Sequence, residues 1–199
     1  MRIGIVIAVL ANLSVAAPAA FGAVYEVHAC RLPNGDPAPA LGWKALAGSV
    51  ASINCPGGRM AVRVPAGTTA FGDEFGLSFR APSGTTLAGL SRRAEGQLVS
   101  TAAFTWAYQE EGTPADGAPV FPMASASGTG PIDMTYQYPF RKRLSALHLL
   151  LKCGDGGNGG PCQQTDSYLG IPQIAVKIDD STPPHVMSVG LLPRVKRTA

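Results

Sequence analysis

Apolar and polar residues alternate with a period of two along most of the chain after residue 23. In residues 74–80, Phe75, Leu77 and Phe79 fall on one side of an extended chain, while glycine, serine and arginine fall on the other. Successive side chains of a β-strand point to opposite faces, so this spacing predicts a half-buried strand. The same period recurs in residues 59–64, 132–138 and 172–179.

Glycine- and proline-rich segments separate these alternating runs. They occupy residues 33–37, 56–58, 65–67, 81–84, 113–117, 125–131 and 154–161. Turn residues at such intervals predict roughly nine or ten short strands in two packed antiparallel sheets. The predicted fold class is therefore all-β, a two-sheet antiparallel sandwich of the jelly-roll (lectin-like) type.

One segment fits two patterns. In residues 141–152, Leu144, Leu147 and Leu151 have helical spacing, yet Leu147, Leu149 and Leu151 equally form one face of a strand. A proline at position 139 precedes the segment, and a cysteine and a glycine-rich turn follow it. These flanks favour a strand that enters a disulfide-linked hairpin.

Composition narrows the class of protein. The chain has 199 residues, room for one ordinary domain, and only 15% of them are charged. With 24 glycines and 17 prolines, turns are frequent and long charged helices are not expected. A formal net charge of +3 is too close to neutral to indicate nucleic acid as a partner.

The first residues have the order of a secretory signal peptide. Arg2 precedes an apolar run over residues 3–10, and small residues follow over 16–23. We expect residues 1–23 to be the signal peptide, 24–180 the sandwich domain, and 181–199 a proline-containing linker with a basic tail. The alternative is an uncleaved membrane anchor, which polar residues in the second half of the apolar run disfavour. The predicted location is secreted or at the cell surface.

Four cysteines in an exported chain predict two disulfides. Of three possible connectivities we favour Cys30 with Cys55 and Cys153 with Cys162, because each pair brackets a turn-rich segment. A zinc site is disfavoured, since the sequence contains no Cys-x-x-Cys motif.

Several segments together resemble a group of exported bacterial proteins without an assigned activity. They are the sequence VYEVHACRLPNGDPAP at residues 24–39, Gly42-Trp43, the sequence NCPGG at 54–58 and the sequence FRAPSGT at 79–85. In that group the region resembles a lectin-like sandwich, often ahead of immunoglobulin-like repeats. The resemblance covers roughly residues 24–180 and implies architecture and surface location, with no reaction attached.

An aromatic stripe provides the candidate binding residues Phe104, Trp106 and Tyr108. If the small residues between them pack inward, these rings lie on an open sheet face and can stack against sugar rings. If the rings point inward, they belong to the core, which is the favoured alternative because exposed stripes are rare. Trp43 is expected to pack the Cys30–Cys55 loop onto the core.

The glycine-rich loop at 154–161 has a weak likeness to calcium-binding turns. Asp155, Asn158 and Asp166 are its oxygen donors, but calcium takes six to eight oxygens. A hairpin tip is the favoured alternative, and we expect no metal and no cofactor.

Catalytic patterns are absent from the sequence. No Gly-x-Ser-x-Gly motif occurs. The adjacent acidic pairs at 73–74, 110–111 and 179–180 would point to opposite faces of a strand, and we expect them at turns and edges. Glu26 and His28 share a strand face, and a surface ion pair is the favoured interpretation.

The preferred hypothesis is an exported, non-catalytic recognition module that binds carbohydrate or a cell-envelope polymer. One alternative is a glycan-active hydrolase or lyase, which requires two close carboxylates in one groove. The other is a structural spacer of the cell envelope, for which we expect no concave face and a buried aromatic stripe. Membrane contact is expected only through an uncleaved leader.

Overall fold

The computed structural model describes residues 23–154 and 160–180. Residues 1–22 of the predicted signal peptide, the linker and tail at 181–199, and the calcium candidates Asp155 and Asn158 lie outside these residues. The described part consists of β-strands and loops, and none of its segments is a helix long and apolar enough to cross a membrane. Its strands are β1 (Ala23–Arg31), β2 (Pro37–Ala38), β3 (Trp43–Ala45), β4 (Val50–Ile53), β5 (Met60–Arg63), β6 (Thr68–Thr69), β7 (Glu74–Arg80), β8 (Thr86–Leu98), β9 (Trp106–Pro114), β10 (Phe121–Ser127), β11 (Gly130–Cys153), β12 (Cys162–Gln163) and β13 (Tyr168–Asp180).

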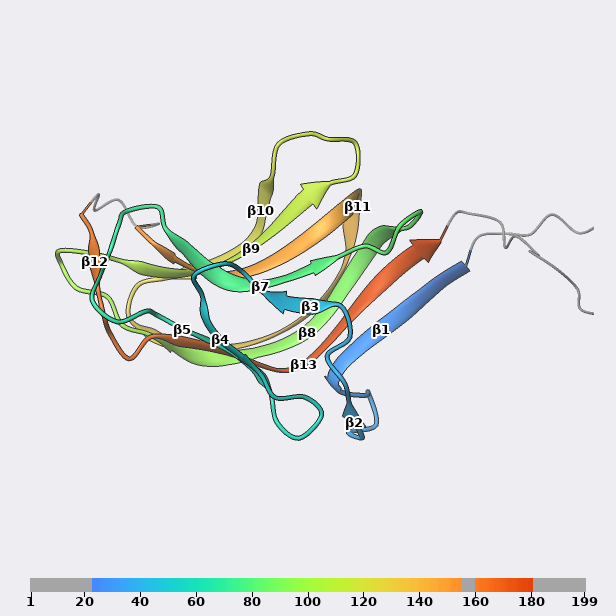
Figure 1. Ribbon diagram of the computed structural model, residues 1–199, viewed down its shortest axis with the longest axis horizontal. Coiled ribbons are helices and arrows are strands. Elements are labelled where there is room, and N and C mark those ends of the chain that lie inside the picture. The colour runs from blue at the N-terminus through green and yellow to red at the C-terminus, as the bar shows by residue number, and fades with distance from the viewer. Residues whose placement is uncertain (1–22, 155–159, 181–199) are drawn as a thin grey trace, which may run out of the picture.

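Eleven of the strands form one hydrogen-bonded network that folds over into two layers. The first layer runs β10-β9-β11-β7-β3, and the second runs β11-β8-β13, with β1 and β5 both pairing along β13. Figure 1 shows β7 and β9 on one side and β8 and β13 on the other. The strand pairs of the described residues are all antiparallel, and neighbours in a layer are mostly not consecutive in the chain. The predicted antiparallel sandwich of jelly-roll type is confirmed.

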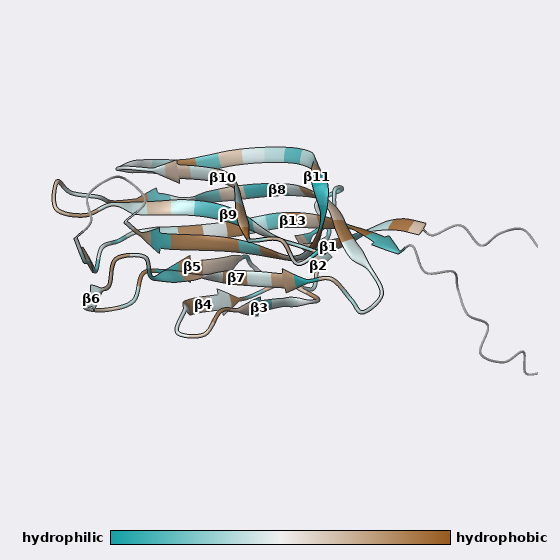
Figure 2. Ribbon diagram, turned by 90° about the horizontal axis from the view of Figure 1, so that it is seen from above, coloured by the Kyte–Doolittle hydropathy of each residue, from teal (hydrophilic) through white to brown (hydrophobic). Residues whose placement is uncertain are grey.

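Strand β11 belongs to both layers. Its first half pairs with β8, its second half pairs with β9 and β7, and the register with β8 shifts between Pro139 and Leu144. Figure 2 shows β11 bending sharply at its hydrophilic stretch, where the arginine- and lysine-containing residues 141–143 lie. This bend is the place where the sheet changes layers.

The predicted strands correspond closely to the observed ones. Residues 74–80 form β7 with the predicted bounds, and residues 141–152 are confirmed as a strand. The expected hairpin beyond Cys153 is wrong, because Cys162 begins β12, which pairs with β6. Pro139 also does not begin a new strand, since β11 continues through it for 24 residues.

The core lies between the inner faces of the two layers. Leucines of β7 and β11 face isoleucines of β13, and these side chains are fully buried; examples are Leu77, Leu149, Ile174 and Ile178. Each fully buried aliphatic side chain stabilises the fold by about 1.5–3 kcal/mol. Trp43 is buried as expected and packs on Phe79, with 5.4 Å between ring centroids.

Both disulfides have the predicted connectivity, Cys30–Cys55 and Cys153–Cys162. The first spans 25 residues of sequence and the second spans 9. Each therefore closes a local loop that would otherwise be free in the unfolded chain.

Replacing both Cys153 and Cys162 with serine is expected to lower the free energy of unfolding by about 2.5 kcal/mol, the loop-closure entropy of so short a loop. Urea denaturation followed by circular dichroism measures this loss. Replacing Cys30 and Cys55 is the comparison, and its longer loop predicts about 3.5 kcal/mol. If the two variants lost equal stability, or if the Cys153/Cys162 variant lost more, loop closure would not explain how much each disulfide stabilises the fold.

Candidate functional site

The predicted aromatic stripe lies in the interior. Phe104 and Tyr108 are buried, and Trp106 has no exposed surface, with its indole Nε1 donating a hydrogen bond of 3.1 Å to the Gln163 carbonyl oxygen. The stripe is also not one strand, because β8 ends at Leu98 and β9 begins at Trp106. The three rings therefore belong to the core, which was the favoured alternative, and do not form an open binding face.

A surface groove lies instead on one side of the sandwich, where an edge strand of each layer approaches the other. Among the described strands, β10 pairs only with β9, and the first half of β11 pairs only with β8. The cavity between them has a volume of about 430 Å³. We call it the β10–β11 groove. Its lining residues are Phe121, Pro122, Met123, Tyr138, Pro139, Phe140 and Arg141.

Both strands are irregular where they line this groove. In β10 the register against β9 skips Met123, which lies between Pro122 and Ala124. In β11 the register against β8 skips residues 140–143. Extra residues of this kind bend a strand and redirect side chains, and such bulges are frequent at sheet edges and next to functional sites. The irregularities place Met123 on one wall and Phe140 and Arg141 on the other.

Gly112 of β9 lies close to Met123 and Leu144, where there is no room for a side chain. A Cβ atom there would lie 2.8 Å from the Leu144 Cδ1 atom and 3.3 Å from the Met123 Sδ atom. A side chain at this position would therefore first displace Leu144 and would also press on Met123.

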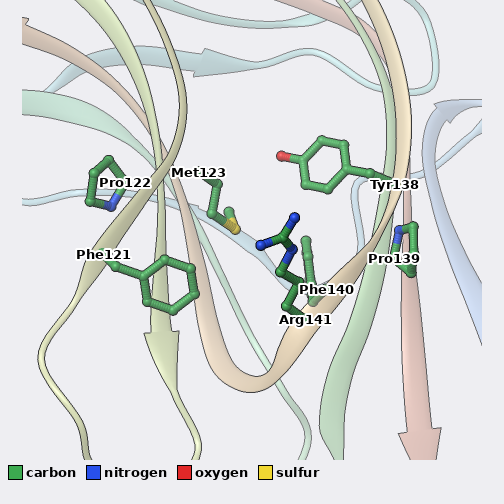
Figure 3. A pocket seen from close by; sticks show the side chains of 7 residues that line it. All are labelled: Phe121, Pro122, Met123, Tyr138, Pro139, Phe140 and Arg141. Carbon is green, nitrogen blue, oxygen red and sulfur yellow. The ribbon is translucent and has the colours of Figure 1, made fainter.

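The groove presents aromatic rings and one cation. Tyr138 and Phe140 are half-buried and pack edge to face, with 5.9 Å between ring centroids and 63° between planes. Figure 3 shows Phe121 facing them from β10, with the Arg141 guanidinium between the two walls. Tyr136, 50% exposed, lies two residues before Tyr138 and so extends the same face of β11.

A buried carboxylate fixes the tyrosine wall from behind. Glu110 of β9 has no exposed surface and accepts hydrogen bonds from the hydroxyls of Tyr138 and Tyr108 and from the Nε of Arg92. Burial, reinforced by the neighbouring Glu110 carboxylate, raises the pKa of both tyrosines well above their ordinary value. Both hydroxyls therefore remain protonated donors, which holds the Tyr138 ring in one orientation.

Arg92 completes this cluster and is only 2% exposed. Its guanidinium lies between two rings, 5.3 Å from the centroid of Tyr108 and 5.2 Å from that of Tyr136. Its Nη1 donates a 3.2 Å hydrogen bond to the Met134 carbonyl oxygen. We call Arg92, Glu110, Tyr108 and Tyr138 the buried polar cluster.

The expectation that Glu110 lies at a turn or edge is wrong. The sequence held a signal for its burial, because Trp106, Tyr108 and Glu110 alternate on one face of a strand. A charged residue continuing a core face indicates a buried partner, and Arg92 is that partner. The groove residues on β10 and β11 carried no comparable signal.

The expectation is also wrong for Glu111, which lies inside β9 between β10 and β11, whereas Asp73, Glu74, Asp179 and Asp180 lie at a turn or at strand ends, as expected. Glu74 pairs with Lys152 at 2.8 Å, and Asp179 pairs with Arg143 at 2.5 Å. Glu26 lies 3.3 Å from His28.

Asp166, the one calcium candidate among the described residues, borders a separate hollow of about 270 Å³. Within residues 23–154 and 160–180, no cluster of three or more histidine, cysteine or acidic residues could hold a metal.

Comparison with known proteins gives partial likenesses. No protein-family model and no curated protein matches the chain. A variant of the family 29 carbohydrate-binding module CBM29-2 is similar at TM-score 0.46 and 11% identity, over 78% of this chain and 92% of that one. The family 11 carbohydrate-binding module from Clostridium thermocellum, in complex with a beta-1,3-1,4-mixed-linked tetrasaccharide, gives TM-score 0.35 and 14% identity, over 79% and 96%. Because these TM-scores and sequence identities are low, the similarities assign no ligand to the chain.

Proposed function

We propose that the protein is an exported, non-catalytic recognition module that binds carbohydrate in the β10–β11 groove. One observation supports this function above all. The groove sets aromatic rings from two edge strands around a cavity of about 430 Å³, and it keeps one of these rings in place through the buried polar cluster.

Aromatic rings suit sugars because the C–H face of a sugar ring is apolar while its edge carries hydroxyls. The rings of Phe121 and Phe140 can pack against the apolar C–H face of a sugar. The Arg141 guanidinium can donate hydrogen bonds to its hydroxyl groups. Preorganised rings lose little conformational freedom on binding, which favours affinity.

The groove lacks the groups that a glycan-active hydrolase requires. Retaining enzymes use two carboxyl groups about 5–5.5 Å apart on either side of the scissile bond. No aspartate or glutamate lines the β10–β11 groove. The nearby carboxylate, Glu110, is buried and already engaged by one arginine and two tyrosines. This supports binding without catalysis.

The groove also differs from a site that adds a peptide strand to a sheet edge. Pro122 on β10 and Pro131 and Pro139 on β11 lack backbone N–H donors. Prolines on edge strands block pairing with another strand. The side-chain surface, and not the backbone, is therefore the part available for recognition.

A spacer of the cell envelope would have a buried aromatic stripe and no concave face. The stripe is buried, but the groove supplies the concave face, which favours recognition. Two disulfides support export, because such bonds persist in oxidising surroundings.

Replacing Phe140 with alanine is expected to weaken oligosaccharide binding about tenfold, since the variant loses a stacking surface worth about 1.4 kcal/mol. Isothermal titration calorimetry of the full chain, on a ligand first found with a glycan array, measures this change.

Phe71→Ala is the matched control, because Phe71 is 53% exposed and does not line the groove. It should leave affinity unchanged. Equal losses in the two variants, or no glycan binding by the unaltered chain, would contradict the proposed function.

A further inference from the structure

Arg141 is the one charged residue in the lining of the β10–β11 groove. It forms no ion pair with any residue in the described part of the chain, and neither does the adjacent Lys142. The third cation of this run, Arg143, is paired with Asp179 at 2.5 Å. Arg141 thus brings an unpaired positive charge into an aromatic groove, and Lys142 carries a second one at the next position, outside the lining.

No negative charge in the lining offsets the Arg141 guanidinium. The Glu110 carboxylate behind Tyr138 is balanced by the Arg92 guanidinium and bound by two hydroxyl groups. The groove is therefore electrostatically positive where a ligand enters it. Such a groove favours an anionic ligand over a neutral one of the same shape.

The register shift in β11 gives Arg141 its place. Residues 140–143 are skipped in the pairing with β8, so Phe140 and Arg141 both reach the groove although they are adjacent in sequence. In a regular strand neighbouring side chains would point to opposite faces. An aromatic surface and a guanidinium consequently lie side by side at this wall, as Figure 3 shows.

We propose that the carbohydrate bound in this groove is an acidic one, a polymer containing uronic acids; this inference rests on the proposed function. The carboxylate of a uronic acid projects from the edge of its sugar ring. A ring stacked over Phe140 can therefore direct its carboxylate toward the Arg141 guanidinium. Guanidinium and carboxylate form paired, charge-assisted hydrogen bonds, which are stronger than bonds to neutral hydroxyls.

The test uses the full chain and calorimetric titration with tetragalacturonate, tetraglucuronate and tetramannuronate. Each is compared with its methyl ester, which keeps the sugar rings and removes the charge. We expect at least one acid to bind about tenfold more tightly than its ester, and to lose affinity as salt is raised. Neutral cellotetraose and xylotetraose complete the set.

Three variants assign the effect to Arg141. Arg141→Gln should bring the acid down to the affinity of its ester, and Arg141→Lys should give an intermediate value because the charge remains and the paired geometry is lost. Lys142→Gln is the matched control, since it removes the same charge one residue outside the lining. It should change affinity less than threefold, by roughly the effect of an exposed charge.

Each outcome distinguishes this inference from the proposed function. If esters or neutral oligosaccharides bind as tightly as the acids, and Phe140→Ala abolishes that binding, the acidic ligand is overturned while the proposed function stands. If Lys142→Gln equals Arg141→Gln, general charge and not the groove is responsible, and the inference also falls. If no oligosaccharide binds, both proposals fall.

Discussion

Glu110→Ala is expected to lower the free energy of unfolding by about 3–5 kcal/mol, because it leaves the Arg92 charge buried without its partner. The arginine cannot reach water from its place between the rings of Tyr108 and Tyr136. The tyrosine hydroxyls lose their acceptor as well. Urea denaturation followed by circular dichroism at pH 7 measures the change.

Glu111→Ala is the control for this variant. Glu111 is the next residue, its side chain is 13% exposed, and it lies 3.9 Å from Lys152. Its removal should cost clearly less than Glu110→Ala, because Lys152 keeps Glu74 as a partner at 2.8 Å and no buried charge loses its only counterion. A double variant, Arg92→Met with Glu110→Leu, should recover most of the lost stability, because no unpaired charge remains. Equal losses in Glu110→Ala and Glu111→Ala would contradict the burial of the cluster.

Trp106→Ala is expected to destabilise the fold by about 3–5 kcal/mol through the cavity that it leaves. The indole is fully buried, packs near Phe75 at 6.2 Å between ring centroids, and donates a hydrogen bond to Gln163. Chemical denaturation of the variant measures the loss.

Phe71→Ala provides the matched aromatic substitution on the surface and should change stability by no more than about 0.5 kcal/mol. A Trp106→Ala protein of undiminished stability that fails to bind glycan would instead place the stripe on the binding surface. The comparison thus separates a core residue from a surface residue that could contact a ligand.

Much of the fold follows from local patterns in the sequence. The period-two runs identified β7 and large parts of β5, β11 and β13, and cysteine spacing identified both disulfides. These features depend on neighbouring residues, so a single sequence contains them. The continuity of β11 through Pro139 could not be predicted, because a proline there is tolerated only at an edge, and edges are set by long-range pairing.

The groove illustrates the same limit. Phe121 and Phe140 come from separate strands, and both walls depend on register shifts against a third and a fourth strand. A bulge is defined relative to its partner strand, so alternation along one segment does not reveal it. Glu110 is different, because its place after Trp106 and Tyr108 on one strand face was visible in the sequence.

Because β11 takes part in both layers, the groove depends on strand pairings in both of them. This strand is complete only when β8, β9 and β7 are all in place, and β7 lies far from it in the chain. Pairing between segments so far apart in the chain is slow, because a long loop must close before the contacts form. The two walls of the groove depend on different pairings, β10 with β9 and the first half of β11 with β8, so ligand capture requires that both layers have formed.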